Sequence, residues 1–232
     1  CQVLNTPVTG GNVSFYNEGL NGPIYPTPVI GMLGIVETLD NVTTPYFKNE
    51  GDIIVLIGEN LGHLGGSEYL KTHYDLVVGD APDIDLVKEK NIQSCCMRLI
   101  AGGLLHSAHD TSEGGLAVAI VESCIFNYEN SHVMGAQIKI DIHTRADAVL
   151  FGEDQSRIII STSPEKLSTV LRTCSEAKVP AKVIGKVTTG TIEINDLVRI
   201  NVNSIATEYY KALQVKIEGA EDLDRVEMTG KR

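Results

Sequence analysis

A continuous run of aliphatic residues constrains the fold of this chain more than any other feature, and it reads Ile53-Ile54-Val55-Leu56-Ile57. A half-buried strand alternates apolar and polar residues, whereas this run places apolar side chains on both faces. It therefore predicts a central strand that is covered on both sides. A second run, Ile158-Ile159-Ile160, predicts another strand of the same sheet.

Apolar spacing and turn residues predict several further elements around these two runs. The expected strands cover residues 29–39 (as a buried strand), 104–108, 135–142, 182–187, 191–195 and 198–202, with a hairpin turn at Thr189-Gly190 between the fourth and fifth. The expected helices begin near Ser67, cover residues 83–101, follow Thr111 or Ser112, cover residues 145–151, open at Ser163-Pro164, and run from Asn203 or Ser204 to Leu213. Strands and helices mix without strict alternation, so the predicted class is α+β, a mixed sheet with flanking helices.

The helix expected after Thr111 or Ser112 has an apolar face and begins at two glycines, Gly114 and Gly115. That face consists of Leu116, Ala117, Ile120, Val121 and Cys124, and we expect it to pack on the sheet. The glycines allow two interpretations. Either the free N–H groups of the first turn hold an anion, or the glycines only permit close packing of a capped helix.

The stretch Gly10-Gly11-Asn12-Val13-Ser14-Phe15-Tyr16-Asn17-Glu18 carries the strongest chemical signal. Two glycines let a backbone approach a bulky anion, the carbonyl oxygen of Asn12 suits Mg²⁺, and Ser14 adds a hydroxyl. These are the parts of a phosphate–metal site. The alternative is a tight turn in which Asn12 and Ser14 bond their own backbone.

Composition narrows the class of protein. The chain has 232 residues, 43% of them hydrophobic and 21% charged, with a net charge of -11. Such acidity argues against nucleic acid as a partner, and no apolar run has the length of a membrane span. The odd number of cysteines, 5, fits no closed disulfide framework, so we expect reduced, mostly buried thiols and a cytoplasmic protein. Because the chain opens on Cys1 without a Met, we expect it to be cut from a longer protein.

Five motifs in order give the chain a resemblance to a known family. They are the stretch from Gly10 to Glu18, then Pro26-Thr27-Pro28-Val29-Ile30-Gly31, Leu64-Gly65-Gly66-Ser67-Glu68-Tyr69, His109-Asp110-Thr111-Ser112-Glu113-Gly114-Gly115-Leu116 and Phe151-Gly152-Glu153-Asp154-Gln155-Ser156-Arg157. Together they resemble the C-terminal part of the phosphoribosylformylglycinamidine synthase family, in its small bacterial form. The fourth motif is shared with the wider aminoimidazole ribonucleotide synthetase superfamily, whose C-terminal domain supplies the expected fold.

The resemblance implies an ATP-dependent ligase of purine biosynthesis. Such an enzyme converts formylglycinamide ribonucleotide and glutamine-derived ammonia to the amidine, with a glutaminase subunit and a small bridging subunit as partners. By motif match, Gly11 would contact ATP, Asn12 would ligate Mg²⁺ and Ser14 would contact the substrate. Residues 1–45 would end the second ATP-site domain, residues 46–215 would form the following C-terminal-type domain, and residues 216–232 would be a tail.

The resemblance also limits what this chain can do alone. It places the catalytic histidine and most metal-binding carboxylates in the family's first half, so no residue here is assigned as catalytic, including His63, His106 and His109. Glu153-Asp154-Gln155 resembles a Glu-Ser-Gln of that first half, which touches substrate, but it has Asp in place of Ser. Here it would line a second site or cap the strand at Ile158. The competing function is a non-catalytic module that binds a nucleotide and helps assembly.

Overall fold

The chain forms two compact units, Cys1–Val42 and Thr43–Arg232. The computed structural model describes residues 1–12, 16–20, 22–24, 27–127 and 133–218. In the smaller unit, β1 (Glu18–Gly19) pairs antiparallel with β2 (Gly22–Pro23), and η1 (Leu39–Asn41) is a 3-10 turn. The side chain of Thr38 caps that turn by accepting the N–H of Asp40.

The prediction of a buried strand over residues 29–39 is wrong. None of the described residues pairs with this run, and its end belongs to η1. The side chains of Val29, Leu33 and Ile35 are exposed, at 92%, 101% and 93%. The sequence has the composition of a strand, but a strand also needs a hydrogen-bonded neighbour, and the described part of this unit supplies none.

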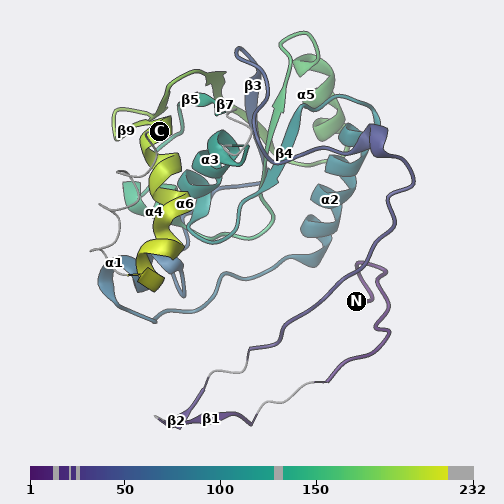
Figure 1. Cartoon of the computed structure of the whole chain (residues 1–232). Helices are drawn as coiled ribbons and strands as arrows, with labels where there is room; N and C mark the ends of the chain where they lie inside the picture. The colour runs from purple at the N-terminus through teal and green to yellow at the C-terminus, as the bar shows by residue number, and fades with distance from the viewer. Residues whose placement is uncertain (13–15, 21, 25–26, 128–132, 219–232) are drawn as a thin grey trace, which may run out of the picture. The chain divides into compact units, whose positions relative to one another are not determined.

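A mixed sheet of 7 strands dominates the larger unit, in the order β4-β6-β3-β7-β5-β8-β9 (Figure 1). Its strands are β3 (Ile53–Ile57), β4 (Ser107–Asp110), β5 (Gly135–Ile138), β6 (Ile158–Thr162), β7 (Ala181–Thr188), β8 (Thr191–Ile194) and β9 (Val198–Asn201). All neighbours run antiparallel except β5 and β8, which are parallel. The two aliphatic runs, β3 and β6, lie side by side inside the sheet, as predicted.

Helices cover both faces of this sheet. They are α1 (Glu68–Tyr74), α2 (Leu86–Ala101), α3 (Gly115–Ile125), α4 (Ala146–Phe151), α5 (Leu167–Glu176) and α6 (Val202–Glu218). Alternate residues of β3 point to opposite faces: Ile54 and Leu56 pack with α3 and α6, while Val55 and Ile57 pack with α2 and α5. Figure 1 shows α2 and α5 together on the side away from α3 and α6. The predicted α+β class and the two covered faces are confirmed.

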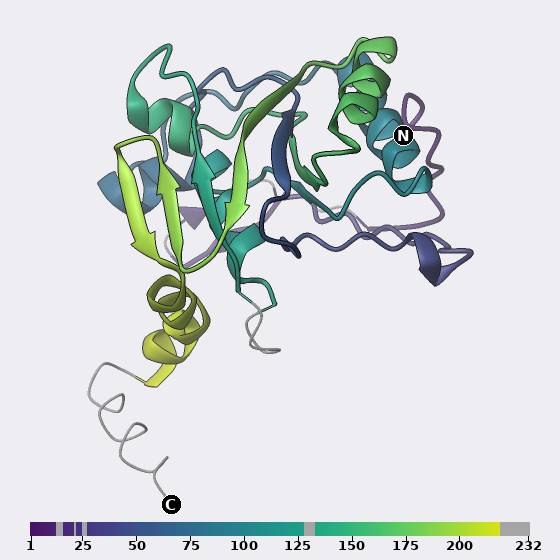
Figure 2. The same cartoon turned by 90° about the horizontal axis from the view of Figure 1, so that it is seen from above.

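The predicted hairpin at Thr189-Gly190 is wrong, although both of its strands exist. Figure 2 shows the teal strand β5 between the green strands β7 and β8. The turn passes around the start of β5, where a β-carbon on Gly135 would lie 2.4 Å from the carbonyl oxygen of Thr191. A two-residue turn therefore joins strands that are next-but-one neighbours, which turn statistics do not anticipate.

Several helix starts also differ from the sequence-based expectation. Ser67 caps α1 as predicted, but Asp85 caps α2, and α5 begins at Leu167 after a turn that follows Ser163-Pro164. Asn201 accepts the first N–H groups of α6, so Asn203 and Ser204 lie inside that helix. For α3, Gly114 with φ +78 takes the cap position in place of Thr111 or Ser112.

All five cysteines lie in the described part of the chain, and none of them forms a disulfide. Cys1 is exposed, and the other four are buried. Three of these, Cys95, Cys96 and Cys174, belong to the core under α2 and α5. Burial raises the pKa of Cys96 to about 11, as expected for thiols that serve packing.

Candidate functional site

The glycine-rich loop predicted to hold phosphate and metal lies in the smaller unit. Gly10, Gly11 and Asn12 are exposed, and a β-carbon built on either glycine meets no heavy atom of the described residues within 4 Å. Within the described residues, close packing therefore requires neither glycine. Ser14, the predicted substrate contact, lies outside the described residues.

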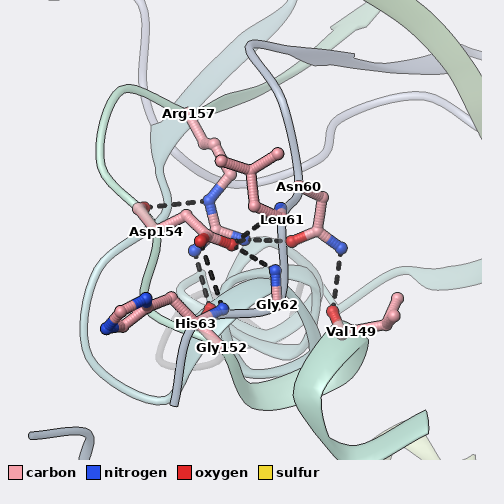
Figure 3. A network of polar contacts seen from close by, with 8 residues as sticks. All are labelled: Asn60, Leu61, Gly62, His63, Val149, Gly152, Asp154 and Arg157. Atoms are coloured by element: carbon pink, nitrogen blue, oxygen red, sulfur yellow. Dashed lines mark hydrogen bonds and ion pairs between the residues drawn. The ribbon is translucent and has the colours of Figure 1, made fainter. Parts of the chain in front are cut away.

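A second predicted region, Glu153-Asp154-Gln155, belongs to the segment that joins α4 to β6 in the larger unit. Figure 3 shows Asp154 at the centre of a network of polar contacts. Its Oδ2 accepts the N–H groups of Leu61 and Gly62 at 2.9 and 2.8 Å, and its Oδ1 accepts the N–H of His63 at 3.1 Å. The residue is only 5% exposed, so this carboxylate is held almost wholly by backbone donors.

Arg157 fixes the same network from the other side, with a side chain that is 0% exposed. Its Nε donates to the carbonyl oxygen of Asp154 at 3.0 Å and its Nη2 to that of Gly152 at 2.7 Å. Its Nη1 donates to Oδ1 of Asn60, whose amide in turn donates to the carbonyl of Val149. Burial lowers the pKa of Arg157, and the charge of Asp154, 3.8 Å away, opposes that shift.

Glu153 joins the starts of two helices. One carboxylate oxygen, Oε1, accepts the N–H of Gly114 at 2.8 Å and the N–H of Glu68 at 2.9 Å. These donors stand at the N-termini of α3 and α1, where the helix dipole favours a negative charge. The anion at the start of α3 is thus a side chain of this chain, supplied from the segment before β6.

Close packing explains the glycine at the start of α3. Gly115 has φ +69, and a β-carbon there would lie 2.5 Å from the carbonyl oxygen of Gly152. Of the two interpretations given for the glycines, this contact favours packing. The α3 face predicted from the sequence does pack on the sheet, with Leu116 and Ile120 fully buried beside Ile54.

A cavity of about 920 Å³ adjoins the network and includes Asp154 and Gln155 in its wall. Its other lining residues come from segments 59–63 and 80–88 and from Ser156. They include four further carboxylates, those of Glu59, Asp80, Asp83 and Asp85. The one lysine of the lining, Lys88, is paired with Glu59 at 2.5 Å. The cavity wall is therefore acidic, which is unfavourable for a phosphate group.

The histidines set aside as catalytic candidates all have partners within the larger unit. Nε2 of His63 lies 2.8 Å from the carbonyl oxygen of Asp80, and Nδ1 of His106 lies 2.7 Å from Oδ2 of Asp52. Nε2 of His109 lies 3.0 Å from Oε2 of Glu122. The described residues contain no group of three or more His, Cys, Asp and Glu side chains placed to hold a metal ion.

His109 carries an unusual charge environment. Burial lowers its pKa, but hydrogen bonds and charge from Asp110 and Glu122 outweigh burial and raise the pKa to about 9. The neighbouring carboxylate is that of Asp110. Hydrogen bonds from His109 and from the hydroxyl of Ser112, which lies 2.6 Å from Oδ2 of Asp110, hold the pKa of Asp110 well below its usual range. His109 and Asp110 end β4 and so precede the start of α3 in the chain.

Sequence reasoning missed the clamping roles of Arg157 and Asn60 and the converging amides of residues 61–63. Backbone donors leave no mark in a motif, because every non-proline residue has one. The available signal was Asp154 itself, since a second carboxylate next to Glu153 needs nearby donors if it is buried.

The chain belongs to the family described as AIR synthase related protein, C-terminal domain, which matches residues 49–195. Phosphoribosylformylglycinamidine synthase subunit PurL of Caldanaerobacter subterraneus subsp. tengcongensis is 47% identical over 203 residues, covering 88% of this chain and 26% of the relative. The fold resembles that of Thermotoga maritima PurL solved with FGAR (TM-score 0.59, 20% identity, 72% of this chain and 30% of the other). The same protein solved with ATP gives a TM-score of 0.55 at 21% identity, covering 72% of this chain and 28% of the other.

The chain thus spans about a quarter of the length of the curated relative that it matches. Within the described residues, no helix is long and apolar enough to cross a membrane.

Proposed function

We propose that this chain acts as the C-terminal part of the ligase that converts formylglycinamide ribonucleotide to formylglycinamidine ribonucleotide in purine biosynthesis. The observation that carries the proposal is the 47% identity to a PurL subunit over 88% of this chain. ATP phosphorylates the amide oxygen of the substrate. Ammonia derived from glutamine then displaces phosphate and leaves the amidine.

The exposed glycine loop is the part of this chain that we propose for ligand contact. The open space around Gly10 and Gly11 supports an approach of ATP phosphates to the backbone, with Gly11 as the contact. The exposed amide oxygen of Asn12 is the kind of hard ligand that Mg²⁺ takes, and Mg²⁺ would neutralise phosphate charge there. We assign the substrate contact to Ser14 by motif match alone.

We also propose the protein's surroundings. A glutaminase subunit would supply ammonia and a small bridging subunit would complete the complex, in the cytoplasm. Catalysis would need the histidine and carboxylates that the resemblance places in the other half of the enzyme. We therefore expect the 232-residue chain alone to release no phosphate from ATP in response to formylglycinamide ribonucleotide.

The test uses a full-length protein that contains this sequence. Substrate-dependent phosphate release should require ammonia, and Asn12→Ala should weaken the dependence on Mg²⁺–ATP, while Ser14→Ala should mainly raise KM for the ribonucleotide. If Asn12→Ala has the same kinetics as the wild type at every Mg²⁺ concentration, the loop is only a turn and not a metal site.

The alternative is a non-catalytic module that binds a nucleotide and supports assembly. The observation that favours it is the internal saturation of the larger unit, where Glu153 and Asp154 already hold backbone donors. A full-length protein that binds ATP but releases no phosphate with substrate and ammonia would support this alternative.

A further inference from the structure

Three successive backbone N–H groups in the loop after β3 converge on one point. The amides of Leu61, Gly62 and His63 all donate to the carboxylate of Asp154, at 2.8–3.1 Å. The turn that aligns them depends on Gly62, which has φ +82 and whose β-carbon would lie 3.2 Å from the carbonyl carbon of Ala148. Successive N–H groups in such a turn form a concave anion-binding nest.

The nest opens beside the acidic cavity, because Leu61, Gly62 and His63 belong to the wall of that cavity together with Asp154. An external anion entering the cavity would find these donors already taken. We infer that the nest of residues 61–63 is an oxyanion-binding site whose resident anion is the chain's own Asp154 carboxylate. Asp154 thereby excludes carboxylate and phosphate groups from this end of the cavity.

Three observations support this inference. Both carboxylate oxygens of Asp154 accept hydrogen bonds. The N···O distances of 2.8–3.1 Å lie within or close to the range of charge-assisted hydrogen bonds. The buried Arg157 supplies the compensating positive charge 3.8 Å away. The rest of the cavity wall is acidic, so a monoanionic carboxylate is the ligand that the emptied nest would accept best.

Chemical rescue of Asp154→Gly tests the inference without relying on the proposed enzymatic function. The substitution removes the carboxylate and leaves a hole of its size beside three unpaired donors, so the melting temperature should fall by roughly 6–15 °C. Sodium formate at ten times its dissociation constant should then restore about 3–6 °C, compared with sodium chloride at equal ionic strength.

Asp154→Asn is the matched control. Its amide has the shape of the carboxylate and fills the hole, so formate should add nothing beyond chloride. Wild type should likewise show no formate-specific stabilisation, and inorganic phosphate should cause no NMR shift confined to the amides of residues 61–63.

The inference is overturned if formate stabilises Asp154→Gly no more than chloride does. It is also overturned if wild type binds phosphate at these three amides. Should Asp154→Gly be recovered unfolded, the yield of refolding in formate against chloride replaces the melting temperature, and Asp154→Ser provides a milder variant. Equal yields in the two salts would then refute the resident-anion site.

Discussion

Two polar regions that each contain glycine have opposite environments in this molecule. The loop at Gly10, Gly11 and Asn12 is exposed, and a β-carbon on either glycine would meet no heavy atom of the described residues within 4 Å. The segment from Gly152 to Arg157 is largely buried. Its two carboxylates accept backbone N–H groups from three other segments, and its guanidinium holds carbonyl groups of the segment itself. A glycine next to Asn, Ser or Glu indicates a polar site, but the source of its hydrogen-bond partners decides whether that site serves a ligand or the fold.

The largest expected loss of stability comes from a substitution in the buried region. Arg157→Met should lower the free energy of unfolding by roughly 3–5 kcal/mol, because it removes the positive charge that compensates the buried Asp154 carboxylate and leaves two carbonyl groups without their donor. Denaturant unfolding of the 232-residue chain measures this. Arg145→Met is the control, since that arginine is 71% exposed and its loss should change the midpoint little. Equal midpoints for the two variants would contradict the clamping role.

The second prediction concerns the contact between α3 and the segment at Gly152. Gly115→Ala should cost roughly 2–4 kcal/mol, because the new β-carbon meets a carbonyl oxygen and the residue must keep φ +69. Gly66→Ala separates the two causes, since Gly66 has the same φ of +69 but no heavy atom of the described residues within 4 Å. That variant should cost about 1 kcal/mol. Similar denaturant midpoints for both variants would remove close packing as the reason for Gly115.

The third prediction extends the comparison to the charged groups that precede α3. The pKa of His109 is raised from 6.5 to about 9 in the folded chain, so its contribution is fully present below pH 6.5 and is lost as the pH rises through 9. After allowance for solvent screening, we expect a loss of about 1–2 kcal/mol over this window. Unfolding midpoints at pH 6 and pH 9.5 measure it. Glu122→Gln should reduce the difference between the two pH values, and an unchanged difference would exclude that pair as its source.

The smallest expected effect lies in the exposed loop. Asn12→Ala should change the free energy of unfolding by less than about 0.5 kcal/mol, because its side chain is exposed. The same denaturant series measures it beside Arg157→Met. A loss above about 1 kcal/mol would make Asn12 a structural residue like those of the buried segment, and the contrast between the two regions would fail.

The sequence predicted the elements that depend on local pattern. The Ile53 and Ile158 runs lie together between two layers of helices, and the apolar face that begins at Leu116 packs on them, because apolar periodicity reports burial directly. The position of β5 between β7 and β8 was not predicted, since hydrogen-bonded order depends on residues far apart in the chain.

The candidate site divides in the same way. The residue types marked Gly11, Asn12 and Glu153 as polar sites, but they could not show which group each would bind or hydrogen-bond. Glu153 caps α3 from a distant segment, while the sequence favoured the nearby hydroxyls of Thr111 and Ser112. Local rules choose a local cap, and here tertiary structure provides a better one.

The placement of β5 has a consequence for the order of folding events. Strands β7 and β8 follow one another in the chain, and such neighbours can close a hairpin within microseconds. In the native sheet, however, both must pair with β5, which arrives from a distant part of the chain and occupies the place between them. A hairpin formed early would have to reopen before β5 entered. The pairing of β5 also closes a long loop, and the entropy cost of that closure is incurred before the native contacts stabilise the chain. An early β7–β8 hairpin would therefore be a non-native pairing that slows the completion of this half of the sheet, whose 189–190 turn must pass around Gly135.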